Sequence, residues 1–78
     1  MKIKILLNEI EKIKRFIEFV HIINADVDLV LGRYTVNAKS VMGIYSLDLT
    51  KPIIAEIYTD DKAEISHFEF LMEEFRVD

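Results

Sequence analysis

Few residues of this sequence have side chains that could do chemistry. His21 and His67 are the only histidines. Neither stands among clustered acids, so we expect both to be surface residues and not metal ligands. The absence of cysteine rules out disulfides and thiolate chemistry. The sequence has no Ser/His/Asp set, no glycine-rich phosphate loop and no pair of catalytic acids. We therefore predict that the chain is not an enzyme and uses no metal or cofactor.

Ser40 is the remaining candidate, and it lies in the run VNAKSVMGIYSL of residues 36–47. Serine is a preferred helix N-cap, so Ser40 predicts a short helix of about Val41–Leu47. A phosphate on Ser40 would meet free backbone N–H groups and a favourable helix dipole, with Lys39 adjacent. The simpler alternative is that Ser40 only caps the helix.

An apolar cluster follows Ser40 at spacings i, i+1 and i+4. Its members are Val41, Met42 and Tyr45. Methionine and tyrosine are enriched at protein interfaces, so we predict that this cluster is a surface that binds a protein partner. The alternative is that some of these side chains pack into the core.

Length and composition predict one globular domain over residues 1–78. The chain is 51% hydrophobic and has a net charge of −4. No apolar run is long enough to span a membrane, and no secretory leader opens the chain. Residues 1–39 hold seven Lys/Arg and five Asp/Glu, whereas residues 40–78 hold three and nine. The acidic second half argues against nucleic-acid binding. We expect a cytoplasmic protein, as a cysteine-free chain permits.

The hydrophobic pattern predicts four strands and three helices. Period-2 alternation indicates strands at residues 2–7, 26–31, 34–36 and 53–58, and Gly32-Arg33 predicts a two-residue type II′ hairpin. An apolar stripe from Ile10 to Ile23 predicts a helix over 9–23, which Asn8 would cap with Glu11 in a capping box. A last helix follows the acidic cap at 59–61. The predicted fold is α+β, an open-faced sandwich of order βαββαβα: a four-stranded antiparallel sheet with three helices on one face.

The run 35–47 resembles the histidine-containing phosphocarrier protein (HPr) family of the bacterial sugar phosphotransferase system. In that family a serine likewise caps a short helix and is followed by two apolar residues and a glycine. The preceding segment 26–34 is also similar, and the element order is that of the HPr fold. By this resemblance, Ser40 matches a serine that a dedicated kinase phosphorylates. Val41, Met42 and Tyr45 match an apolar docking patch.

The chain departs from the family at the entrance to the first helix. Family members have a loop there, with a phosphate-carrying histidine followed by an arginine and a proline. Aligned without gaps back from residue 26, Glu9 falls at the histidine, Glu11 at the arginine and Lys12 at the proline. About half a dozen residues of the loop are missing, and two carboxylates would repel a phosphoryl group. We expect no phosphate transfer at this position.

Three functions fit these observations. The first is an HPr-like regulatory module that binds an HPr kinase, a transcriptional regulator or a metabolic enzyme and is switched at Ser40. The second is an atypical phosphocarrier that uses His21 or His67. The third is a structural or oligomerisation domain. The sequence leaves open whether the protein is a monomer or a homodimer.

Overall fold

The computed structural model describes residues 1–77. The element order is that predicted from the sequence, with a short 3-10 turn added after the last helix. The elements are β1 (Lys2–Ile5), α1 (Ile10–Ile22), β2 (Asp26–Leu31), β3 (Tyr34–Asn37), α2 (Val41–Tyr45), β4 (Ile53–Tyr58), α3 (Lys62–Met72) and the turn Glu73–Phe75.

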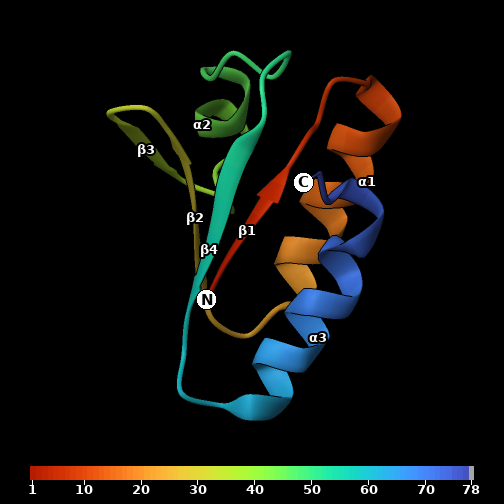
Figure 1. Cartoon of the computed structure of the whole chain (residues 1–78), viewed down its shortest axis with the longest axis vertical. Coiled ribbons are helices and arrows are strands. Elements are labelled where there is room, and N and C mark those ends of the chain that lie inside the picture. The colour runs from red at the N-terminus through yellow and green to blue at the C-terminus, as the bar shows by residue number, and fades with distance from the viewer. Residues whose placement is uncertain (78) are drawn as a thin grey trace.

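The four strands form one antiparallel sheet in the order β1-β4-β2-β3. Figure 1 shows α1 and α3 side by side along one face of this sheet, with α2 near the β2–β3 hairpin. No helix of residues 1–77 lies on the opposite face. This arrangement confirms the predicted open-faced sandwich.

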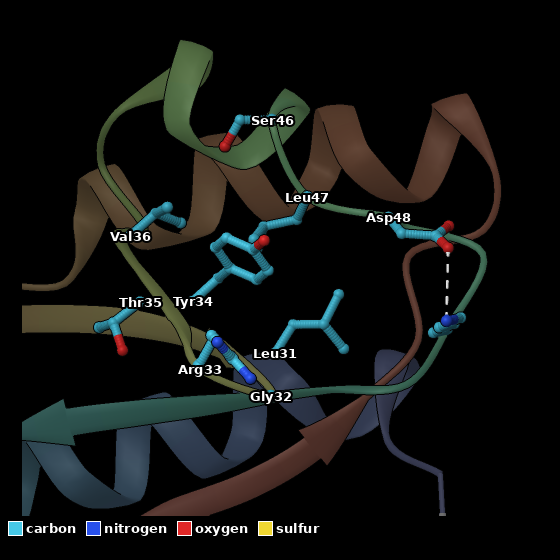
Figure 2. Close-up of a pocket in the computed structure, with 10 residues that line it drawn as sticks. Leu31, Gly32, Arg33, Tyr34, Thr35, Val36, Ser46, Leu47 and Asp48 are labelled. Atoms are coloured by element: carbon cyan, nitrogen blue, oxygen red, sulfur yellow. Dashed lines mark ion pairs between the residues drawn. The ribbon is translucent and has the colours of Figure 1, made fainter.

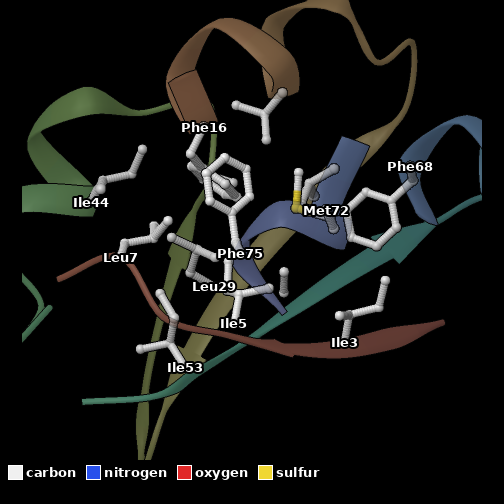
Figure 3. Packing of buried hydrophobic residues seen from close by; sticks show 14 of the residues in the cluster. Ile3, Ile5, Leu7, Phe16, Leu29, Ile44, Ile53, Phe68, Met72 and Phe75 are labelled. Carbon is white, nitrogen blue, oxygen red and sulfur yellow. The ribbon is translucent and has the colours of Figure 1, made fainter. Parts of the chain in front are cut away.

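The core lies between the sheet and the helices, and it is entirely apolar in the part of the chain that the structure describes. Alternate residues of the strands form one side of the core, and the inner faces of the helices form the other side. Figure 3 shows Phe75 beside Phe16 at its centre, with ring centroids 5.9 Å apart in an edge-to-face arrangement. The largest fully buried side chains are Phe16, Phe68, Phe75, Ile5, Leu7, Ile23, Leu29, Ile44, Ile53, Met72, Val20 and Val27.

The segment after α3 returns to the first strand and closes the sheet edge. The backbone N–H of Leu6 donates to the Phe75 carbonyl at 2.9 Å, and that of Val77 donates to the Lys4 carbonyl at 3.0 Å. On the outer surface, Arg15 of α1 pairs with Glu74 at 3.1 Å. The outer edge of β1 is therefore covered by this chain's own residues, which limits pairing with other strands.

The β2–β3 hairpin has the predicted turn. Leu31 pairs with Tyr34, so Gly32 and Arg33 are the two loop residues. Gly32 has φ of 60°, and it is the only residue with positive φ in the described chain. A single positive φ at the first loop position is the type II′ geometry, which glycine adopts without strain.

Two details at the start of α1 differ from the prediction. The N-cap is Glu9 and not Asn8, and its side chain makes no capping hydrogen bond. The first strand ends at Ile5 and not at Leu7, although Leu7 is still fully buried. Ile10 was expected in the buried stripe, but it is 65% exposed. It lies in the first turn, and burial in α1 begins only at Ile13.

The second helix also ends earlier than expected. α2 stops at Tyr45, where the Ser46 hydroxyl donates to the Gly43 carbonyl at 2.6 Å and satisfies a terminal acceptor. α3 stops at Met72, so Phe75 reaches the core from the 3-10 turn rather than from the helix.

Candidate functional site

Ser40 is an exposed helix cap, as predicted. Its backbone is extended, with φ of −94° and ψ of 107°, and its Oγ accepts a hydrogen bond from the Gly43 N–H at 3.2 Å. The Ser40 carbonyl accepts from the Ile44 N–H at 3.0 Å and begins the helix. The hydroxyl is thus held at the N-terminus of α2 and open to solvent, a position that suits both a cap and a modification site.

Gly43, three residues after Ser40, is closely packed. A Cβ atom on Gly43 would lie 3.2 Å from Ser40 Oγ and 3.3 Å from Val36 Cβ. Both distances are shorter than ordinary van der Waals contact. Gly43 therefore lets α2 lie against β3 while the Ser40 hydroxyl keeps its place over the first turn.

Val41, Met42 and Tyr45 all lie on the outer side of α2. They are 44%, 85% and 53% exposed, whereas Ile44 on the inner side is fully buried. Ile44 anchors the helix to the core and sets the direction in which the other three point. Their exposure argues against the alternative that they are core residues. A role in partner binding stays a prediction.

Lys39 is adjacent to Ser40 in sequence, but its ammonium group is engaged elsewhere. Lys39 Nζ donates to the Ile23 carbonyl at the end of α1, at 2.9 Å. This contact ties the segment before α2 to the C-terminal end of α1, where a cation is favoured by the helix dipole. The contribution of Lys39 to a phosphate on Ser40, which the sequence suggested, would require this bond to break.

The entrance to α1 is acidic. Glu9 is the exposed N-cap, and Glu11 in the first turn lies 3.9 Å from Lys14. Lys12 is half-buried. The N-terminal end of α1 thus presents two carboxylates.

The two histidines lie on different helices and do not meet. His21 is exposed near the end of α1, with Nδ1 2.6 Å from the Ile17 carbonyl. Because a carbonyl oxygen only accepts hydrogen bonds, Nδ1 is the donor in this contact. His67 is exposed on α3. No group of three potential metal ligands occurs among residues 1–77.

The structure also contains a pocket that the sequence did not predict. Figure 2 shows it between the β2–β3 hairpin and the segment that joins α2 to β4. Its volume is about 660 Å³. The only available signal was Gly32-Arg33-Tyr34, a hairpin tip that carries a cation and an aromatic ring. The lining residues are Leu31, Gly32, Arg33, Tyr34, Thr35, Val36, Ser46, Leu47, Asp48 and Lys51.

Two ionisable groups have shifted pKa values. The Thr50 hydroxyl and N–H both donate to Asp48, beside the pocket, and lower the pKa of that carboxyl. On the helix-free face of the sheet, the Tyr58 hydroxyl donates to Glu56 at 2.9 Å, which raises the pKa of Tyr58. In both cases a local side-chain hydrogen bond is the largest cause of the shift.

No helix in residues 1–77 is long and apolar enough to cross a membrane. No protein-family model matches the sequence, and no curated protein is significantly similar to it. Solved structures do match. The chain is similar to a phosphocarrier protein HPr from Bacillus anthracis, with TM-score 0.75, 23% identity and coverage of 97% of this chain and 94% of that one.

The chain is also similar to HPr-C-His from Thermoanaerobacter tengcongensis. That comparison has TM-score 0.72 and 21% identity, and it covers 95% of this chain and 90% of that one. Two matches of this quality extend over nearly the whole length of all three chains. The protein therefore has the fold of the HPr phosphocarrier proteins.

Proposed function

We propose that this protein is an HPr-like regulatory module that binds protein partners through α2 and is switched by phosphorylation of Ser40. The observation that carries the proposal is the exposure of side chains on α2. Its capping serine is exposed, and three apolar side chains beside it face solvent while Ile44 holds the helix in place. The acidic entrance to α1 supports a role without histidine phosphotransfer.

The proposed switch is electrostatic. A phosphate on Ser40 adds a charge of about −1.5 to −2 at neutral pH, directly beside Val41 and Met42. A partner that buries these side chains would then also face a dianion. A partner with a basic side chain there would bind more tightly, and one without it would be repelled.

The proposal is tested with an HPr kinase and ATP, followed by mass spectrometry of the intact and digested protein. We expect one phosphate, on Ser40, and none on the Ser40→Ala variant. Ser46→Ala is the matched control, because Ser46 is exposed at the other end of α2 and should not affect labelling. Absence of phosphate on wild-type Ser40 would remove the switch from the proposal.

The docking role is tested in the same assay through kcat/KM. Met42→Asp and Tyr45→Asp should each lower it by about tenfold, since one interface anchor contributes more than about 1 kcal/mol. Phe70→Asp is the control, because Phe70 is 77% exposed on α3. Equal losses in all three variants would indicate a general effect of charge and would contradict a docking surface on α2.

A further inference from the structure

The pocket beside the β2–β3 hairpin has the dimensions of a small-molecule site. Its volume of about 660 Å³ falls within the range of roughly 300–1,000 Å³ that such sites occupy. Val41, Met42 and Tyr45 do not line it. It is therefore a different surface from the proposed docking site on α2.

The floor of the pocket is apolar, and an aromatic ring lies over it. Leu47 is almost fully buried, and Leu31 and Val36 are half-buried beside it. Tyr34 is 66% exposed, and Figure 2 shows its ring between Leu47 and Leu31, directed across the hollow. A flat apolar group could cover this ring and the leucines together, which would remove an exposed aromatic surface from water.

The charge of the pocket is opposite to that of the whole protein. Two cations, Arg33 and Lys51, line it together with one carboxylate, Asp48. Lys51 is paired with Asp48 at 3.9 Å. Arg33 is exposed at the hairpin tip and has no ion pair within residues 1–77. Its guanidinium is thus available to an anion, in a chain whose net charge is −4.

We propose that this pocket binds a small aromatic anion, with its ring against Tyr34 and its carboxylate, sulfonate or phosphate group on Arg33. An extended peptide added to the edge of β3 fits less well. That strand is only four residues long, and the carbonyl and side-chain oxygens of its last residue, Asn37, already accept hydrogen bonds from Ser40 and Lys39. Little unpaired edge is left for a peptide.

The probe for this site is 8-anilinonaphthalene-1-sulfonate, an aromatic sulfonate whose fluorescence increases on burial. We expect saturable binding to the wild-type protein with one site per chain. Arg33→Ala should weaken binding by about tenfold or more, since it removes a hydrogen bond to a charged group. Tyr34→Ala should weaken it to a similar degree. Lys62→Ala and Phe70→Ala remove an exposed cation and an exposed aromatic from α3 and should leave binding unchanged.

A neutral analogue separates the two halves of the site. N-phenyl-1-naphthylamine lacks the sulfonate, so it should bind more weakly than the sulfonate, with equal affinity for wild type and Arg33→Ala. Arg33 is exposed and makes no ion pair within residues 1–77, so this variant should fold normally. Unsaturable sulfonate binding, or equal affinity for wild type and Arg33→Ala, would overturn the proposal.

The location of the bound probe is checked by methyl NMR. Shifts confined to Leu31, Val36 and Leu47 are expected, with no change at Val20, which is buried in α1. Shifts at Val41 and Ile44 without shifts at Leu31 would place the probe on α2 and contradict the assignment.

Discussion

Replacement of Ser40 separates its capping role from its proposed role as a switch. In Ser40→Ala, the Gly43 N–H loses its acceptor, the Ser40 Oγ at 3.2 Å. Loss of a serine cap costs about 1 kcal/mol. The stability of a 78-residue domain is expected to be roughly 4–12 kcal/mol, from typical values per residue. The loss is therefore measurable without unfolding the protein.

Ser40→Asp should behave differently although it also removes the hydroxyl. Aspartate is as good an N-cap as serine, and its charge is favoured at a helix N-terminus. We expect the melting temperature of Ser40→Ala to fall by about 4–8 °C, by the usual conversion for a domain of this size, and that of Ser40→Asp to stay near wild type. Partner binding should change in Ser40→Asp and not in Ser40→Ala.

Thermal unfolding followed by circular dichroism measures both variants. Ser66→Ala is the control, because Ser66 is exposed on α3 and its hydroxyl makes no hydrogen bond within residues 1–77. It should be as stable as wild type or slightly more so, since alanine is the better helix former. The reasoning is refuted if Ser40→Ala melts within 1 °C of wild type or if Ser40→Asp loses as much stability as Ser40→Ala.

Three further predictions concern the core and the shifted pKa values. Phe75→Ala should destabilise the protein by about 3–5 kcal/mol in urea unfolding, because Phe75 is 1% exposed; a loss below 1 kcal/mol would show that the C-terminal turn does not close the core. Thr50→Val should raise the pKa of Asp48 in an NMR titration. Because the pKa of Asp48 is lowered in the wild-type protein, any stabilisation from this carboxylate is present at neutral pH and is lost as the pH falls through that pKa. The free energies of unfolding of wild type and Thr50→Val should therefore converge in acid. Glu56→Gln should lower the pKa of Tyr58 towards 10.0, followed by phenolate absorbance, and an unchanged pKa would contradict the hydrogen bond as its cause.

The strands could be predicted from the sequence because each buries one face. Alternation at 26–31 and 53–58 gave the bounds of β2 and β4 correctly, since a slip of one residue would expose a whole row of apolar side chains. Gly32 similarly predicted the hairpin turn, because the first loop position has a positive φ, which glycine adopts readily. Ser40 was likewise predicted as a helix N-cap, because the capping preference of serine depends only on the neighbouring residues.

Features that depend on distant contacts could not be predicted in this way. Asn8 and Glu11 match a capping box, but Glu9 is the N-cap and α1 begins at Ile10. The turn that holds Phe75 pairs with β1 across almost the whole chain. The pocket lies between the hairpin and the segment after α2. No local sequence pattern predicts that these two parts of the chain lie side by side.

The central claim is that Ser40, and not a histidine, receives phosphate in this protein. It is tested most directly by intact-protein mass spectrometry after two parallel incubations. One contains ATP and an HPr kinase, and the other contains phosphoenolpyruvate and the first enzyme of the phosphotransferase system. We expect one acid-stable phosphate on Ser40 in the first incubation and no label in the second. An acid-labile phosphate on His21 or His67 in the second, with Ser40 unlabelled in the first, would contradict it.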